Sequence, residues 1–80
     1  MYSTYVLQSQ KHSRYYIGSC KNADERLERH NSGRIPITKS GRPWSFIHTE
    51  SFDTRVEAVK RERQIKSYKG GNAFKKLIKR

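Results

Sequence analysis

Three stretches of the chain predict β-strands. The first, residues 2–8, is rich in β-forming residues and places Tyr5 and Leu7 on one face. The second, residues 15–19, follows a polar, turn-like stretch, so we expect the two to form a hairpin with a longish loop. The third stretch, residues 44–52, predicts one further strand.

Helical spacing and capping residues predict three helices. Asn22 followed by Glu25 is typical of a capping box, which predicts a helix from Ala23 to about Ser32 with Gly33 as its carboxy-terminal cap. A second helix is expected to begin after Asp53 or Thr54 and to run to about Tyr68. Gly70 and Gly71 end it, and a short basic helix is expected over residues 72–79.

These elements occur in the order β-β-α-β-α-α. Residues 34–43 hold both prolines and Gly41, so we expect an irregular loop there. No repeat and no interdomain linker is visible, which predicts a single domain over residues 1–80. The fold class expected is α+β, a three-stranded antiparallel sheet flanked by helices.

Composition excludes several classes of protein. No apolar run approaches the ~20 residues of a membrane-spanning helix, and no hydrophobic signal segment follows Met1. Cys20 is the single cysteine, so it cannot form an internal disulfide, and nothing indicates secretion. The histidines and Cys20 show no C-x₂-C pair and no matched histidine pair, which disfavours zinc. We therefore expect a cytoplasmic protein without membrane association.

The charge of the chain predicts an anionic partner. Eighteen Lys and Arg against seven Asp and Glu give a net charge of +11. Residues 60–80 hold nine Lys or Arg and one acid, and aromatic residues interleave with the basic ones, unlike in a disordered basic tail. Basic surfaces bind nucleic acid by neutralising phosphates, and anionic membrane or acidic protein are the alternatives. We expect a folded domain with a phosphate-facing side.

Glu62 breaks the pattern of the second helix. At about 100° per residue it falls inside the apolar arc defined by Ala58, Val59 and Ile65. A carboxylate on the buried side of a helix is costly unless it is paired or binds a metal ion. The alternative is an ion pair with Lys66 at i+4.

The first helix and the hairpin hold further candidates. Arg26 and His30, spaced i and i+4, either flank the core or point together into one cleft. Tyr5 and Tyr16 lie on adjacent strands, where tyrosines are usually packing residues. Gly18 inside a strand weakens it and often marks close approach by a ligand or another backbone.

Together these residues resemble the GIY-YIG nuclease superfamily. The second half of its signature is intact as Tyr16-Ile17-Gly18, and the first half is present as Thr4-Tyr5-Val6. Thr4 replaces a glycine, which is tolerable if only backbone geometry matters there, and Cys20 stands where Thr is common. Arg26-x-x-x-His30 with Asn31 and Gly33 resembles the first-helix motif, and Glu62 with Ile65-Lys66 the glutamate motif.

Within that superfamily the chain is most similar to a small stand-alone, single-domain branch related to the amino-terminal nuclease domain of the excision-repair protein UvrC. The segments 41–44 (GRPW) and 60–66 (KRERQIK) carry this similarity. It implies an endonuclease acting on DNA, in DNA repair, and assisted by one Mg²⁺ or Mn²⁺ ion on Glu62. RNA stays open as a substrate, and so does a protein partner that supplies specificity.

The resemblance also implies a role for each site residue, and we expect the five side chains to share one small hollow. Tyr5 is the general base and His30 accepts its proton, with Arg26, His30 and the metal lowering the pKa of the phenol. Arg26 stabilises charge on the phosphate, and Tyr16 donates a hydrogen bond near the phosphate or to a water on the metal.

Further residues are expected to contact nucleic acid. Gly18 would allow close backbone approach, and Asn72 falls where several members of the superfamily have a late active-site Asn. The other expected contacts are basic: Arg42, Lys66, Lys75 and Lys76, with the basic run continuing to Lys79 and Arg80. The alternative function is a non-catalytic nucleic-acid-binding module on the same fold, in which Glu62 only pairs with Lys66.

Overall fold

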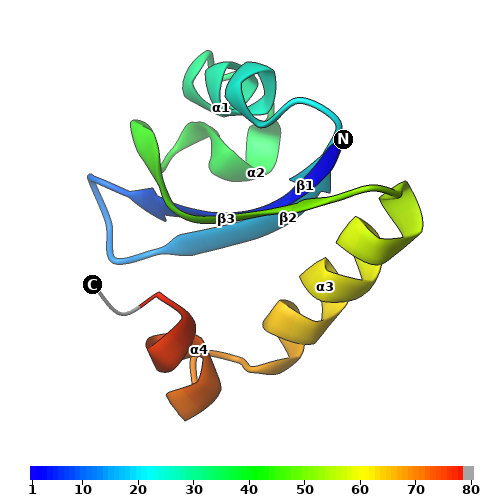
Figure 1. Cartoon of the computed structure of the whole chain (residues 1–80). Helices are drawn as coiled ribbons and strands as arrows, with labels where there is room; N and C mark the ends of the chain where they lie inside the picture. The colour runs from blue at the N-terminus through cyan, green and yellow to red at the C-terminus, as the bar shows by residue number, and fades with distance from the viewer. Residues whose placement is uncertain (79–80) are drawn as a thin grey trace.

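The chain forms a three-stranded antiparallel sheet with helices on both faces (Figure 1). The structure is a computed structural model, and it describes residues 1–78. The strands lie in the order β2-β1-β3, with β1 at Tyr2–Ser9, β2 at Tyr15–Cys20 and β3 at Trp44–Phe52. One face carries α1 (Ala23–Asn31) and α2 (Pro36–Lys39), and the other carries α3 (Arg55–Ser67) and α4 (Asn72–Leu77).

The predicted α+β class and order of elements are confirmed, with one addition. The segment expected to be an irregular loop contains α2, a single helical turn. Pro36 stands at its first position, where the backbone N–H that proline lacks would make no intrahelical hydrogen bond. The N–H of Thr38 bonds back to the carbonyl of Ile35 at 3.2 Å, which closes the turn.

The predicted helix boundaries follow from local capping. The Asn22 side chain accepts a hydrogen bond from the Glu25 N–H at 3.0 Å. Of the two candidate caps for α3, the structure uses Thr54, which accepts from the Glu57 N–H. Gly33 has a φ of 82° beyond the end of α1, a conformation that glycine adopts without strain. Lys79 and Arg80 lie outside the described residues.

Strand β1 is buried on both faces and divides the core in two. Tyr5 and Leu7 pack with Trp44 on the side of α1. Val6 packs with Ile65 of α3 and Phe74 of α4 on the opposite side. The alternation predicted for residues 2–8 is therefore confirmed, and each face of the sheet has its own core.

A β-bulge in β3 sets which of its side chains face which layer. Val6 pairs with His48 but Leu7 pairs with Phe46, so Ile47 is the extra residue. The shift keeps Phe46 on the α1 side of the sheet and places His48, opposite Val6, on the α3 side. The sequence pattern did not predict this bulge.

The side chain of Thr4 fastens α3 to the sheet. Thr4 is fully buried, and its hydroxyl donates a 2.7 Å hydrogen bond to the carbonyl of Ala58. The threonine that replaces the signature glycine thus contributes a bond through its side chain, and backbone geometry is not its whole role. Among residues 1–78, no helix is long and apolar enough to cross a membrane.

Candidate active site

A buried hydrogen-bonded chain runs from β1 to α2 beneath α1. The Tyr5 hydroxyl lies 3.1 Å from Nε2 of His30. The other ring nitrogen, Nδ1, lies 2.8 Å from the hydroxyl oxygen of Thr38. Tyr5 is 1% exposed and His30 is fully buried, so these bonds lie where water does not compete for them. His30 therefore turns into the core, whereas Arg26 lines two surface hollows that do not include His30.

Tyr16 forms the outer part of this cluster. Its ring stacks on that of Tyr5, with the centroids 6.4 Å apart and the planes at 28°. It also approaches His30 at 4.7 Å between centroids. Tyr16 is half-buried, so it is the more exposed of the two signature tyrosines.

Gly18 leaves room for the Tyr5 hydroxyl. The two residues are paired across β1 and β2, and a Cβ on Gly18 would lie 2.5 Å from the Tyr5 hydroxyl oxygen. The group that approaches Gly18 closely is therefore a side chain of the same chain, which explains the glycine without a ligand. Contact between Gly18 and nucleic acid stays a prediction.

The protein environment keeps both groups of the Tyr5–His30 pair neutral at pH 7. Burial raises the pKa of Tyr5, the nearby Tyr16, Cys20 and Glu62 add to this, and Arg26 opposes it. Burial and the charge of Arg26 lower the pKa of His30. The expectation that the protein's own groups lower the pKa of the phenol is wrong, because burial outweighs the guanidinium.

Glu62 turns toward the sheet from α3, and its side chain is 19% exposed. One carboxylate oxygen accepts a 2.6 Å hydrogen bond from the Ser19 hydroxyl of β2. The other accepts from the ammonium of Lys66 at 2.6 Å, and the Lys66 side chain is 53% exposed. Both interpretations of Glu62 therefore hold, since it points inward and also forms the i+4 ion pair.

The carboxylate and the phenol lie on either side of the edge strand β2. Tyr5 packs over Gly18 on the α1 face, and Glu62 bonds to the next residue, Ser19, on the α3 face. The five site residues thus lie around β2, but they are divided between its two faces. The expectation of one shared hollow is corrected accordingly.

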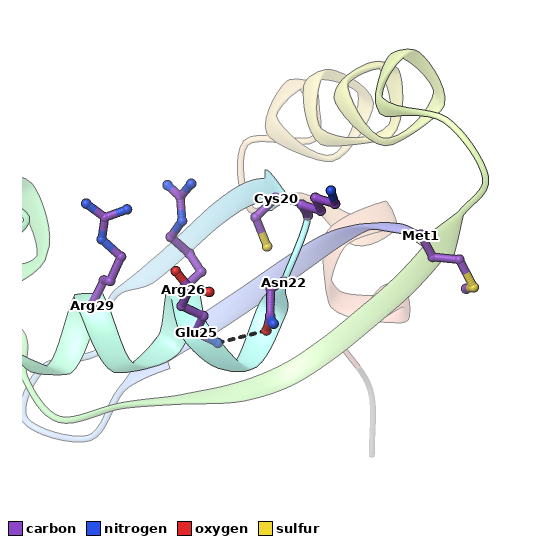
Figure 2. Close-up of a pocket in the computed structure, with 7 residues that line it drawn as sticks. Met1, Cys20, Asn22, Glu25, Arg26 and Arg29 are labelled. Carbon is purple, nitrogen blue, oxygen red and sulfur yellow. Dashed lines mark hydrogen bonds between the residues drawn. The ribbon is translucent and has the colours of Figure 1, made fainter.

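Two contiguous hollows wrap around the carboxy-terminal end of β2, and Arg26 lines both. The first is shown in Figure 2, where Arg26 and Arg29 extend from the same side of α1. The second lies toward α3 and is lined by Ser19, Arg55 and Ala58 among others. Both hollows share Cys20, Lys21 and Arg26, so they form one groove, which we call the β2-end groove.

The β2-end groove holds basic residues that sequence reasoning missed. Lys21, Arg29 and Arg55 line it and form no salt bridge within residues 1–78. Arg29 lies three residues after Arg26 and so projects on the same side of the helix, a signal that the sequence did contain. Arg55 joins the group only through the packing of α3 on the sheet.

The other residues predicted to contact nucleic acid are spread over the molecule. Arg42 lies at the far end of α1, where its guanidinium borders Gly33 and donates to the Lys39 carbonyl at 2.9 Å. Helix α4, with the exposed residues Asn72, Lys75 and Lys76, packs through Phe74 against Tyr15. Tyr15 begins β2, about 13 Å along the strand from Ser19. The structure does not bring these residues to the β2-end groove.

A divalent cation would depend on Glu62. Within residues 1–78 no three His, Cys, Asp or Glu side chains gather closely enough to share a metal ion. A single carboxylate nevertheless fits Mg²⁺ or Mn²⁺, because a hard cation keeps several waters and takes further oxygens from substrate phosphate. Ser19 orients the carboxylate, and the exposed Lys66 is the partner that a cation would displace.

Comparison with known proteins gives these residues a family. The family model described as the GIY-YIG catalytic domain matches residues 1–75, which include Tyr5, Tyr16, Arg26, His30 and Glu62. A UPF0213 protein of Staphylococcus saprophyticus is 41% identical over 54 residues. UPF0213 proteins of Staphylococcus aureus strains Mu3 and N315 show the same identity over the same length. In each case the match covers 66% of this chain and 66% of the relative.

The family model therefore covers all three strands, the helix that carries Arg26 and His30, and the helix that carries Glu62. Its match confirms the resemblance that the two tyrosines and the helix motifs indicated. Members of this family are nuclease-type domains that act on DNA and generally use a divalent metal ion. The chain belongs to the GIY-YIG family.

Proposed function

We propose that the protein is an endonuclease that hydrolyses phosphodiester bonds in DNA. In this proposal Tyr5 takes the proton of the attacking water, and Glu62 holds one divalent cation. The observation that supports it best is the 3.1 Å hydrogen bond between the Tyr5 hydroxyl and His30, two neutral groups buried beside β2, the edge strand whose Ser19 bonds to Glu62.

The hydrogen bond to His30 makes Tyr5 a usable base although burial raises its pKa. A free-standing phenol of raised pKa would hold its proton at neutral pH. If the Tyr5 proton moves to Nε2 of His30 as the oxygen receives a proton from water, no phenolate accumulates. The roles of base and proton acceptor assigned to Tyr5 and His30 therefore depend on each other.

Access to the Tyr5 hydroxyl sets a condition on this mechanism. Because Tyr5 is 1% exposed, substrate binding must open a path to its oxygen. Tyr16 stacks against it and is half-buried, so in the proposal the displacement of Tyr16 opens this path. In the proposal the Tyr16 hydroxyl then donates a hydrogen bond to the phosphate.

Arg26 and Glu62 supply the electrostatic part of the proposal. Arg26 lines both hollows of the β2-end groove and forms no salt bridge within residues 1–78, so its guanidinium fork is available to phosphate oxygens. A cation on Glu62, when bound, would withdraw negative charge from the scissile phosphate. We further propose that Lys21, Arg29 and Arg55 hold the DNA backbone along the same groove.

A plasmid-nicking assay tests the proposed function. Wild-type protein with Mg²⁺ or Mn²⁺ is expected to convert supercoiled plasmid to open circles. Glu62→Gln and Tyr5→Phe should each slow nicking by at least about 10²-fold, since each removes one preorganised group. Glu57→Gln is the matched control, because Glu57 is an exposed carboxylate on the same helix. Equal cleavage by wild type and both site variants would refute the assignment.

The alternative is a DNA-binding module that does not cleave. The Glu62–Lys66 ion pair favours it, because the pair gives the carboxylate a structural role without a metal ion. This alternative predicts plasmid binding with no nicking under any divalent cation.

A further inference from the structure

Thr38 connects the Tyr5–His30 pair to the backbone of α2. Its hydroxyl oxygen lies 2.8 Å from Nδ1 of His30 and 3.3 Å from the carbonyl oxygen of Ile35. Thr38 is as buried as Tyr5 and His30, so each donor in this chain must find its acceptor within the chain rather than in water.

Counting donors and acceptors decides where the imidazole proton lies. With the proton on Nδ1, the Tyr5 O–H donates to Nε2, the Nδ1–H donates to Thr38, and the Thr38 O–H donates to Ile35. Every proton in the chain then has an acceptor.

The opposite tautomer leaves a donor unsatisfied. With the proton on Nε2, that N–H would donate to the Tyr5 oxygen and the Thr38 hydroxyl would donate to Nδ1. His30 is the one hydrogen-bond partner of the Tyr5 hydroxyl within the described residues, so the buried O–H of Tyr5 would have no acceptor. Leaving a buried donor unpaired is costly, which favours the Nδ1–H form.

We propose that Thr38 is a positioning residue that fixes His30 in the Nδ1–H tautomer, so that its Nε2 lone pair faces the Tyr5 hydroxyl. The inference rests on the proposed function for its consequence, because that lone pair is what would receive the Tyr5 proton. It also gives the Tyr5 oxygen free lone pairs for the proton of water, since its own hydrogen points toward His30.

The surrounding structure holds Thr38 in place for this role. The indole N–H of Trp44 donates to the Thr38 carbonyl at 2.8 Å. The side-chain amide of Asn31, which follows His30, bonds both the N–H and the carbonyl of Trp44 at 2.6 and 3.1 Å. The end of α1, the start of β3 and the turn α2 are thereby tied together around His30.

Nitrogen NMR tests the tautomer without any need for cleavage. Long-range ¹H–¹⁵N correlations of histidine-labelled protein distinguish Nδ1–H from Nε2–H in a neutral ring, and His12→Gln and His48→Gln variants assign the signal of His30. The wild type should show Nδ1–H at pH 7. Thr38→Val keeps the shape of the side chain and removes the hydroxyl, so its His30 should show a mixture of the two tautomers. Thr38→Ser should restore the Nδ1–H form. A wild-type ring in the Nε2–H form overturns the inference.

The rate and its pH dependence test the consequence. Thr38→Val should slow nicking about 10²-fold, the lower end of what general acid–base catalysis contributes, and Thr38→Ser should recover most of it. The pKa of His30 lies below its ordinary value of 6.5, and protonated His30 donates from both ring nitrogens, so it cannot accept the Tyr5 proton. Nicking should therefore fall as His30 is protonated at acid pH. Losing the Thr38 acceptor destabilises the charged imidazolium more than the neutral ring, which lowers the pKa of His30 further. The acid limb of Thr38→Val should therefore move to lower pH. The charged or titratable groups around His30 are Arg26, Tyr5 and Tyr16.

Thr4→Val separates positioning from stability. Thr4 is an equally buried threonine that donates to a backbone carbonyl, but on the opposite face of the sheet. It should lower the melting temperature without moving the acid limb or the tautomer. If Thr38→Val matches Thr4→Val in every readout, Thr38 is structural and the inference fails. If neither the wild type nor any variant nicks DNA and His30 still shows Nδ1–H, the proposed function fails and the tautomer assignment stands. If Thr38→Val does not fold, the wild-type spectrum alone decides the tautomer.

Discussion

The two edges of the sheet each hold a partly buried glutamate from which very different chemistry follows. At the β3 edge, Glu50 is 25% exposed, and its oxygens accept two bonds from Nε of Arg61 at 2.9 and 3.1 Å and one from His48 at 2.6 Å. At the β2 edge, Glu62 is held by a neutral hydroxyl and by one exposed lysine. Similar burial therefore gives one satisfied carboxylate and one available carboxylate.

The partners of the two carboxylates explain the difference. Arg61 is itself fixed by bonds to Gln64 at 2.9 Å and to Tyr68 at 3.4 Å, so its guanidinium is not free to leave Glu50. Lys66 is a point charge on a flexible stem in solvent, and a divalent cation can replace it. A carboxylate on the inner side of a helix is thus a poor indicator of function until its partners are known.

The largest effect expected from this comparison is on DNA binding by the β2-end groove. Replacing Lys21, Arg29 and Arg55 together with Gln should weaken binding about 10²-fold at 0.15 M salt. The slope of log K against log salt should fall by about two to three units on duplex DNA, and by less on a single strand, since each phosphate contact contributes about 0.9 or 0.7. Fluorescence anisotropy with Glu62→Gln as background measures both.

The matched control for this prediction neutralises Lys69, Lys75 and Lys76, three exposed basic residues around α4. The sequence predicted two of these as nucleic-acid contacts, so the two triple variants set that prediction against the groove. A larger loss of slope in the α4 variant would place the DNA there and remove Lys21, Arg29 and Arg55 from the proposal.

The next effect is on stability, at the opposite edge. Glu50→Gln should lower the free energy of unfolding by about 1–2 kcal/mol, because it breaks charge-assisted hydrogen bonds of a partly buried group. Nicking per folded molecule should be unchanged. Urea denaturation of Glu50→Gln beside Glu28→Gln, an exposed carboxylate on α1, measures the difference. Loss of nicking in folded Glu50→Gln would mean that the two edges do not differ as described.

The pH dependence of this stability has a definite sign. Burial acts to raise the pKa of Glu50, but hydrogen bonds from Arg61 and His48 outweigh it and the pKa is lowered. A carboxylate whose pKa is lower in the folded protein contributes its full stability above the unfolded pKa, and loses it as the pH falls through the folded pKa. The gap between wild type and Glu50→Gln should therefore be largest near neutral pH and close in acid.

Sequence reasoning found the features that depend on local spacing. The strand alternation of residues 2–8, the caps at Asn22 and Thr54, and the inward side of Glu62 all follow from periodicity within a single element. Its ion pair with Lys66 was foreseen for the same reason, as the two lie one helical turn apart.

The missed features depend on contacts between elements. Thr38 lies in a proline- and glycine-containing stretch without periodicity, so nothing local indicated that its hydroxyl meets His30. The Glu50–Arg61 contact requires the bulge in β3 together with the docking of α3. The raised pKa of Tyr5 likewise follows from burial beneath Tyr16 and Phe46, which neighbours in sequence do not reveal.

The smallest effect tests whether Glu62 is available to a cation. Lys66→Gln should tighten Mn²⁺ binding about 2- to 5-fold, the contribution of one exposed ion pair that the metal ion would otherwise displace. Lys60→Gln is the control, because Lys60 is exposed on the same helix and forms no salt bridge within residues 1–78. Electron paramagnetic resonance of free Mn²⁺ reads the affinity without DNA, so a role of Lys66 in DNA binding cannot mask the result. Equal Mn²⁺ affinity in Lys66→Gln, Lys60→Gln and wild type would show that the ion pair does not compete with metal, and the contrast between Glu62 and Glu50 would lose its chemical meaning.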